Sequence, residues 1–332
     1  MNKTFIIAEA GVNHNGRLDL AFRLCDAARA AGADAVKFQT WVTEKIVTAD
    51  TAMAGYQQRN LDSDQSQYRM LKALELSYAQ FAKIKRYCDT LGITFLSTGD
   101  NPEDIDFLLG LGMPCIKLGS GDITNIPLLR HVGRCARPVL LSTGMSDLEQ
   151  VRRAYGTLRE AGAKDITVLH CTTNYPCPPE EVNLRAMQTL ARELDCPVGY
   201  SDHTLGTEVP VAAVAIGACV IEKHLTLDRT MEGPDHPASM EPDEFHEMVR
   251  QIRHIESALG DGIKRPNDSE RAIAGSVLKR IVAQRDIRKG EVLDETVLAV
   301  KRSPTGLGAD RWDEVCHTRA IRDFHQDEAI EI

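Results

Sequence analysis

Two histidines close short apolar runs that stand close together in the sequence. His203 follows the run at 197–200, and His224 follows the run at 218–221. The stretch between them, 207–217, is rich in Ala and Val and has the length of a helix. We therefore expect two consecutive parallel strands that present both imidazoles at one rim, where they can share a metal ion.

The kinds of ligand near His203 and His224 limit the choice of ion. A lone histidine at a strand end is often only a hydrogen-bonded structural group, so the pairing carries the metal hypothesis. No cysteine thiolate is adjacent, and imidazole, carboxylate and water together suit Mn²⁺, Fe²⁺ or Zn²⁺. Two protein ligands leave coordination positions open for water or substrate.

Lysines and hydroxyls close other apolar runs. A charge at the end of a buried run is costly unless it is paired, so Lys37 and Lys117 have two explanations: salt bridges to Glu9 or Asp122, or a bound anion. Lysines supply charge and hydroxyls supply donors, which favours an anion with phosphate and carboxylate groups. The further candidates for this anion site are Lys223, Thr98, Ser120, Ser142 and Ser201.

The loop 11–16 follows Glu9 and contains Asn13, His14 and Asn15. These donor and acceptor side chains suit a polyhydroxylated ligand, although Asn15 is also a candidate N-cap for the next helix. His170 closes another run, and we expect it to support the rim. His131, His246, His254 and His325 are expected to be surface or packing groups.

Eight apolar runs of strand length alternate with helical patterns, and each run ends in polar residues. Eight strand-helix units in about 260 residues predict a TIM (β/α)8 barrel, an α/β fold whose active site lies at the carboxyl ends of its strands. The expected strands are 5–8, 35–36, 94–96, 115–116, 139–141, 167–169, 197–200 and 218–221.

The barrel pattern ends near residue 260, so we divide the chain into a catalytic domain at 1–260, a linker at 261–275 and a small β-rich module at 276–332. The module is marginal as an independent core, and we expect it to dock on its own barrel or on a second copy. Within the barrel, a longer insertion at 40–92 is either a lid or substrate wall, or a solvated loop.

Composition indicates a cytoplasmic enzyme. The chain is 43% hydrophobic and 26% charged, and it contains no apolar stretch of membrane-spanning length and no secretion signal. Nine scattered cysteines form a poor disulfide framework, which fits a reducing compartment. A net charge of -9 without a basic stripe argues against a nucleic-acid partner.

Several motifs, in one order, resemble those of the sialic acid synthase family of nonulosonic acid synthases. The terminal module resembles the antifreeze-like (SAF) domain of that family through 281–283 and 300–304. The barrel motifs are AEAGVNHNG (8–16), VKFQT (36–40), KLGSGD (117–122), LSTGM (141–145), GYSDHT (199–204), EKHLTLD (222–228) and GPDH (233–236).

This resemblance implies a condensation of phosphoenolpyruvate with an N-acylated mannosamine-type sugar and water, by C–O cleavage, in a homodimer whose SAF domains each cover the partner's barrel. It implies a divalent metal, Mn²⁺ before Mg²⁺ or Co²⁺, on His203 and His224, with Asp122 as a further contact through water. It assigns catalysis to Glu9, Lys37, Lys117, Glu222 and Asp235. It assigns substrate binding to Asn13, Thr98, Ser120, Ser142, Thr173, Asn174, Ser201, Lys223 and, from the partner, Arg302.

Three departures from the family's pattern stand at the mouth. Gly99-Asp100 replaces Pro-Phe, Asp122 replaces a longer Glu, and Thr173 stands where some relatives have Asn, which leaves Thr173 and Asn174 as rival phosphate donors.

More than one function stays open for this barrel. The favoured sugar is N-acetylmannosamine, and the alternative is a 2,4-diacetamido-2,4,6-trideoxymannose, which would give N,N'-diacetyllegionaminate. An aldolase or a synthase that uses an unacylated phosphosugar is a third reading, but no additional basic cluster supports it. The most remote reading is a non-catalytic sugar-binding barrel.

Overall fold

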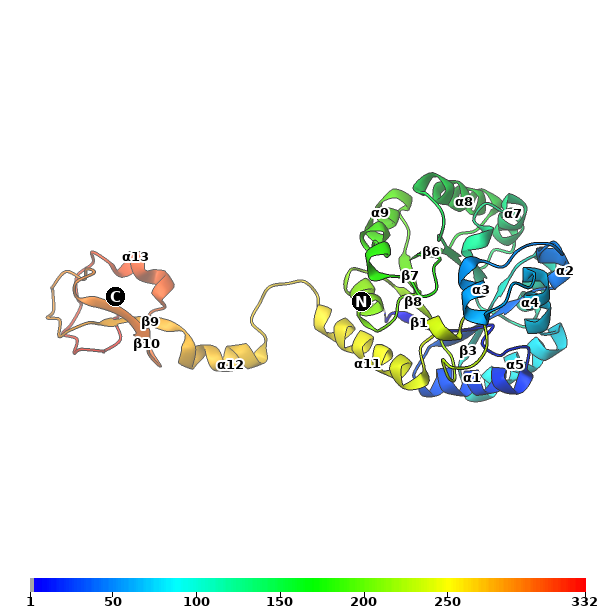
Figure 1. The fold of residues 1–332 in the computed structure, drawn as a ribbon. Coiled ribbons are helices and arrows are strands. Elements are labelled where there is room, and N and C mark those ends of the chain that lie inside the picture. The colour runs from blue at the N-terminus through cyan, green and yellow to red at the C-terminus, as the bar shows by residue number, and fades with distance from the viewer. Residues whose placement is uncertain (1–2) are drawn as a thin grey trace. The chain divides into compact units, whose positions relative to one another are not determined.

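A computed structural model of the chain describes residues 3–332, and eight of its strands form a closed parallel barrel (Figure 1). The strands pair in chain order, and β1 pairs with β8 to close the ring. The predicted TIM barrel is therefore confirmed. Its strands are β1 (Phe5–Gly11), β2 (Ala35–Thr40), β3 (Thr94–Gly99), β4 (Ile116–Leu118), β5 (Val139–Ser142), β6 (Ile166–Cys171), β7 (Val198–Asp202) and β8 (Val220–His224).

Helices surround this ring, and polar caps set where several of them begin. Ser77, Asn101 and Asp147 each accept a hydrogen bond from a backbone N–H in the first turn of the helix that follows. The outer helices are α1 (Leu18–Ala30), α5 (Tyr78–Leu91), α6 (Pro102–Gly110), α7 (Ile126–Arg134), α8 (Leu148–Ala161), α9 (Arg185–Leu194), α10 (Glu208–Ala215) and α11 (Pro242–Leu259), with short 3-10 turns at Ser120–Asp122, Pro179–Glu181 and His236–Ala238.

The N-cap expected at Asn15 is wrong. Helix α1 begins after Arg17, which makes no side-chain cap. The Asn15 side chain instead donates to the backbone oxygen of Glu232, 2.9 Å away, and so ties the first loop to the segment after β8.

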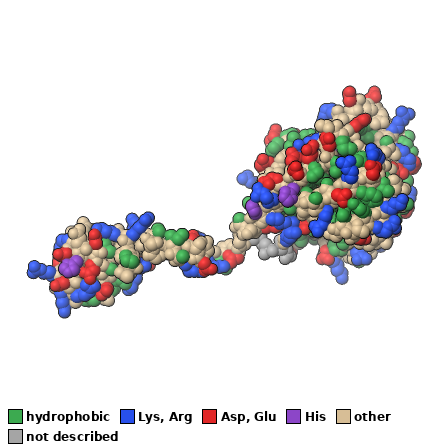
Figure 2. Space-filling view, turned by 90° about the horizontal axis from the view of Figure 1, so that it is seen from below, with side chains coloured by type: hydrophobic (Ala, Val, Ile, Leu, Met, Phe, Trp, Pro, Cys, Tyr) green, Lys and Arg blue, Asp and Glu red, His purple; other side chains and the backbone are tan. Residues whose placement is uncertain are grey.

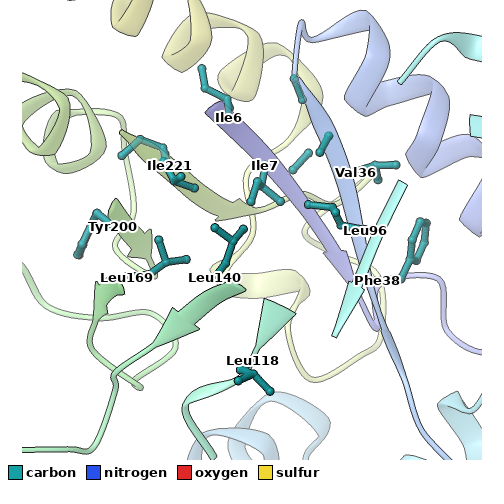
Figure 3. Close-up of a cluster of buried hydrophobic side chains, with 14 of the residues drawn as sticks. Ile6, Ile7, Val36, Phe38, Leu96, Leu118, Leu140, Leu169, Tyr200 and Ile221 are labelled. Carbon is teal, nitrogen blue, oxygen red and sulfur yellow. The ribbon is translucent and has the colours of Figure 1, made fainter. Parts of the chain in front are cut away.

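Alternation along each strand divides the core into two parts. Side chains of one parity point into the ring, among them Ile7, Leu96, Leu140 and Leu169 near the centre of Figure 3. Side chains of the other parity, such as Ile6, Phe38, Leu118, Tyr200 and Ile221, point toward the helices in the same view. The residue two positions after each of these inward apolar residues points to the same side and lies at the mouth of the barrel.

The insertion at 40–92 is largely helical, unlike the loop expected from its composition. Its last helix, α5, is the outer helix between β2 and β3, so the extra structure lies between β2 and α5. It contains α2 (Thr43–Ile46), α3 (Gly55–Leu61) and α4 (Gln67–Leu74). A small apolar cluster of its own holds it against the barrel: Val12, Trp41, Met53, Met70 and Leu74.

The chain divides into two compact units, the first ending at Asp261 and the second spanning Gly262–Ile332. The second unit has a separate core that includes Ile281, Leu293 and Phe324. The segment 287–293 of this unit forms only isolated bridges, and the expected linker at 261–275 is partly helical. Its elements are α12 (Asp268–Val277), β9 (Lys279–Ala283), β10 (Leu298–Arg302), a 3-10 turn (Ala309–Arg311) and α13 (Trp312–Val315).

Charged side chains of both signs are interspersed over the face shown in Figure 2. Within residues 3–332, no helix combines the length and the apolar character needed to cross a bilayer. All nine cysteines fall in this range, and each is a free thiol.

Candidate active site

A cavity of about 160 Å³ opens at the carboxyl ends of the barrel strands. Four of its lining side chains have no role assigned from sequence: Gln39, Asp100, Cys171 and Tyr175. Gln39 follows Lys37 by two positions and Cys171 follows Leu169 by two, so strict alternation would have found both. The cavity brings together most of the predicted site: Glu9, Lys37, Thr98, Lys117, Ser120, Ser142, Ser201, His203, Glu222 and His224.

Lys37 pairs with Glu9 across two neighbouring strands. The register of β1 and β2 places the two residues opposite each other, and the Nζ atom of Lys37 lies 2.6 Å from Oε2 of Glu9. The same ammonium group donates to Thr98 Oγ1 at 3.0 Å, and Gln39 donates to Glu9 Oε1 at 3.0 Å. The salt bridge and the anion site are thus compatible, since the lysine also faces the cavity.

A second group lies around Glu222. Its carboxylate is 3.5 Å from Lys117 Nζ and 3.8 Å from Lys37 Nζ, and it accepts a hydrogen bond from Ser201 at 2.9 Å. Lys117 also donates to Ser142 Oγ at 2.7 Å. Five strands therefore supply one buried network of charges and hydroxyls, from β2, β4, β5, β7 and β8.

The network sets the charge states in the mouth. Burial alone would raise the pKa of Glu222, but Lys117, Lys37 and the Ser201 hydroxyl outweigh it and lower that pKa to about 2. Burial lowers the pKa of Lys117, and Glu222 offsets only part of this effect. Burial, with the carboxylates of Asp122 and Asp104, raises the pKa of Asp100 to about 7. Glu222 is therefore an anion at neutral pH, whereas Asp100 titrates near neutrality.

A tight turn brings Ser120 against the loop after β5. The backbone N–H of Gly144 donates to Ser120 Oγ at 3.0 Å, and a Cβ atom on Gly144 would lie 2.2 Å from Thr173 Oγ1. Only glycine leaves these hydroxyls room beside the backbone. The Thr173 hydroxyl is buried without a hydrogen-bond partner, whereas the Asn174 amide donates to Glu181 at 3.2 Å. This difference favours Thr173 as the phosphate donor.

The histidine pair has the geometry of a metal site. The two rings lie 5.6 Å apart between centroids, and burial lowers both pKa values, so each ring is neutral and can bind a cation. The Nδ1 atom of His203 is 2.7 Å from the oxygen of Thr172, which leaves Nε2 as the ligand. Nδ1 of His224 is buried and has no hydrogen-bond partner. These residues fit a shared divalent ion.

Two more side chains lie beside the histidines. Asp235 Oδ2 is 4.0 Å from His224 Nδ1, and the ring of Tyr175 lies 4.1 Å from His203 and 5.6 Å from His224. Across residues 3–332, the one set of three potential ligand atoms within 4.8 Å of one another lies elsewhere, on Asp106, His131 and Cys135 of the outer helices. Among the described residues, the mouth therefore offers two histidines without a third His, Cys, Asp or Glu ligand atom at that distance.

Seven predicted site residues lie outside the cavity lining: Asn13, Asp122, Thr173, Asn174, Lys223, Asp235 and Arg302. The prediction for Lys223 is wrong because Lys223 alternates with Glu222 and His224; it points away from the cavity, forms a buried ion pair with Asp202 and donates to Thr204 at 2.7 Å. Asn13 donates to Leu225 and Ser239, both at 2.9 Å, and so fixes its loop. Asp122 accepts from Asn125 at 3.0 Å.

His170 and Arg302 have simpler surroundings. His170 Nε2 is 2.7 Å from the oxygen of Val182, which fits the expected supporting role. Arg302 ends β10 in the second unit, and its side chain is exposed. It pairs in register with Lys279 of β9.

Comparison with known proteins gives the family. A model of the NeuB family matches residues 24–264, and a SAF domain model matches residues 280–331. The chain is 45% identical over 332 residues to the N,N'-diacetyllegionaminic acid synthase of Campylobacter jejuni, with 99% of each chain covered. It is 46% identical over 319 residues to the protein of the same name from Legionella pneumophila, with 95% of this chain and 90% of that one covered.

A solved structure agrees with these matches. The N-acetylneuraminic acid synthetase of Leptospira borgpetersenii, in complex with citrate, matches with a TM-score of 0.72 and 33% identity. The match covers 83% of this chain and 93% of that one. The chain therefore belongs to the NeuB family, the sialic acid synthases, and ends in a SAF domain, as the resemblance of its motifs predicts.

Proposed function

We propose that this NeuB-family protein condenses phosphoenolpyruvate with 2,4-diacetamido-2,4,6-trideoxymannose and water, giving N,N'-diacetyllegionaminate and phosphate. The observation that carries this choice is the near full-length identity to two proteins named N,N'-diacetyllegionaminic acid synthase. N-acetylmannosamine, the sugar favoured from the motifs alone, has less support than this alternative.

Phosphoenolpyruvate binds on the side of the cavity that carries Lys37 and Lys117. Their ammonium groups supply charge, and nearby hydroxyls supply donors for phosphate and carboxylate oxygens. The low pKa of Glu222 supports this role, because a permanent carboxylate opposes the effect of burial on both lysines. The hydroxyls are those of Thr98, Ser120, Ser142, Thr173 and Ser201.

A divalent ion, Mn²⁺ before other ions, is proposed on His203 and His224. When bound, it lowers the pKa of a water molecule and polarises the aldehyde oxygen of the sugar. The network contains two ammonium groups and two carboxylates, so its net charge is zero without a ligand. The positive charge of a bound divalent ion therefore strengthens the attraction for an anionic substrate. Glu9, paired in register with His224, and Asp235 flank this position and are assigned to the sugar.

In the reaction, C3 of phosphoenolpyruvate forms a bond to the aldehyde carbon, and water adds its oxygen at C2. The bond between C2 and the bridging oxygen then breaks, and phosphate leaves with that oxygen. One proton of the water passes to the aldehyde oxygen, and the other leaves with the phosphate as C2 becomes a carbonyl group. Lys37 is placed to hold a proton near these atoms, because its ammonium group lies between Glu9 and Glu222.

The assembly is proposed to be a cytoplasmic homodimer in which the SAF domain of one subunit covers the barrel of the other. Arg302 of that domain would then bind the N-acyl group of the sugar. An exposed guanidinium at the end of β10 supports this role, since it is not used by the small core of its own unit.

Isotope labelling tests the proposed chemistry. Phosphate release should require protein, phosphoenolpyruvate, sugar and Mn²⁺ together. With phosphoenolpyruvate carrying ¹⁸O at the bridging position, the label should appear in the released phosphate. Label in the keto acid would contradict C–O cleavage, and no phosphate release with any N-acyl mannosamine would contradict the proposed function.

A further inference from the structure

Helix α3 of the insertion brings Tyr56 to the edge of the barrel mouth. The ring of Tyr56 lies 4.8 Å from the ring of Tyr175, which lines the cavity. Tyr175 in turn lies 4.1 Å from the ring of His203 and stands edge-on to His224 at 5.6 Å. An aromatic layer therefore runs from the histidine pair outward to α3.

Contacts of α3 and of the neighbouring helix α4 fix the insertion in this position. Asn60 donates to the backbone oxygen of Pro234 at 2.6 Å, directly before Asp235. The backbone of Gly16 approaches the α4 segment so closely that a Cβ atom would lie 2.5 Å from the oxygen of Ala73. The apolar cluster around Trp41 and Met70 packs beneath. The segment after β8, which carries Asp235, thus holds α3, and the loop after β1 holds the neighbouring helix α4.

The two sides of the cavity differ in chemistry. One side carries the lysines and hydroxyls, which suit an anion, and the other carries the histidines and Tyr175, the only phenol or indole ring in the lining. An uncharged sugar whose aldehyde lies at the histidine pair would extend along the aromatic layer. A hydroxyl facing an aromatic ring loses hydrogen bonds to water without replacement, whereas a methyl group, including the methyl of an acetamido group, packs against the ring.

We propose that Tyr56 is a positioning residue that holds Tyr175 as the wall of the sugar subsite, and that this wall selects a sugar bearing methyl and acetamido groups, in place of hydroxyls, at the end remote from its aldehyde. The inference rests on the proposed function and deepens it. It also assigns the insertion the role of a substrate wall, one of the two roles expected from its length.

Paired kinetics on two sugars test this role. The variants are Tyr56→Ala and Tyr56→Phe, with Tyr68→Ala on the same insertion as a matched control, because its hydroxyl contacts Glu44 instead of the mouth. The two sugars are 2,4-diacetamido-2,4,6-trideoxymannose and N-acetylmannosamine. Each variant is assayed for kcat/KM with both sugars in competition, for the KM of phosphoenolpyruvate and for melting temperature.

Tyr56→Ala should lower kcat/KM for the diacetamido sugar by on the order of 10-fold or more, with a much smaller loss for N-acetylmannosamine. The KM of phosphoenolpyruvate should stay unchanged, and Tyr56→Phe and Tyr68→Ala should keep the wild-type sugar ratio. An equal loss for both sugars, a raised KM of phosphoenolpyruvate or no change in Tyr56→Ala would overturn the inference alone. No turnover of either sugar by the wild type would overturn the proposed function and the inference with it.

Discussion

The carboxylate of Glu222 lies 3.5 Å from the ammonium group of Lys117, and both side chains are buried within the barrel mouth. Lys37 lies 3.8 Å from the same carboxylate. One residue of β8 thus stabilises two positive charges from β2 and β4. Removing the carboxylate would leave two buried ammonium groups with less compensation, which is a large electrostatic change for buried charges.

Glu222→Gln should therefore lower kcat/KM by roughly 100-fold or more, comparable to the loss of a preorganised charge in other active sites. The fold should persist, which circular dichroism and the melting temperature can verify. Ser201→Ala is the comparison: it removes one hydrogen bond to the same carboxylate, worth about 1 kcal/mol, together with one hydroxyl assigned to phosphoenolpyruvate, and should still cost far less activity. Equal losses in the two variants would count against this view of the charge network.

The histidine pair makes a prediction about metal. His224→Ala should lose bound Mn²⁺ and turnover together, because one remaining imidazole is a weak ligand set. His246→Ala, an exposed histidine of α11, should keep both. Metal content by atomic absorption and phosphate release are the two readouts. Wild-type turnover in a His224→Ala protein that has lost its metal would contradict the role of the metal. A wild-type protein without turnover, whose sugar binding is unchanged by His224→Ala, would contradict the enzyme assignment.

The raised pKa of Asp100 should make the stability of the protein depend on pH. Its pKa is about 7 in the folded protein against an ordinary value near 3.8, so the folded chain holds an extra proton between these two pH values. Folding is favoured by that proton at pH 4 to 7, and the advantage is lost as the pH rises through 7. Asp100→Asn should therefore raise the melting temperature more at pH 8 than at pH 5.

The same carboxylate faces the anion side of the cavity. Its ionisation should raise the KM of phosphoenolpyruvate as the pH passes through 7, and Asp100→Asn should flatten that rise. Identical pH profiles for the KM in the two proteins would contradict an ionising Asp100 in the site.

If Arg302 acts in the site of the partner subunit, two inactive variants should restore activity to each other in mixed dimers. Arg302→Ala should raise the KM of the sugar far more than that of phosphoenolpyruvate, by roughly 10-fold to 100-fold for one lost charge-assisted hydrogen bond. Lys279→Ala, exposed and opposite Arg302 on the same two strands, is the control. Mixed dimers of Arg302→Ala and Lys117→Ala subunits should regain part of the activity. No recovery after verified subunit exchange would mean that the arginine acts within its own subunit or not at all.

Alternation explains which site residues could be predicted from sequence. The apolar runs located the strands, and their polar ends located Lys37, Lys117, Glu222 and His224, because a strand end is a local feature. The prediction of Lys223 as a substrate-binding residue was wrong because the apolar run locates the end of the strand but does not show which side chains point into the barrel. Side chains two positions apart share a face, whereas neighbours point to opposite sides.

Other features depend on packing between distant segments. Tyr56 and Tyr175 are more than a hundred residues apart, and nothing in either neighbourhood indicates their contact. The helices of the insertion were missed because a polar composition near 57–67 predicts a solvated loop, although a cluster around Trp41 and Met53 holds the segment in place. Contacts between segments that are distant in the sequence cannot be predicted until the fold is known.

A competition between two sugars tests the central claim most directly. The purified wild-type protein, with Mn²⁺ and phosphoenolpyruvate, receives equal concentrations of 2,4-diacetamido-2,4,6-trideoxymannose and N-acetylmannosamine, and mass spectrometry measures both nine-carbon acids at early times. The proposed function predicts N,N'-diacetyllegionaminate as the main product, with stoichiometric phosphate. A main product of N-acetylneuraminate would contradict the sugar assignment, and the absence of both acids would contradict the function.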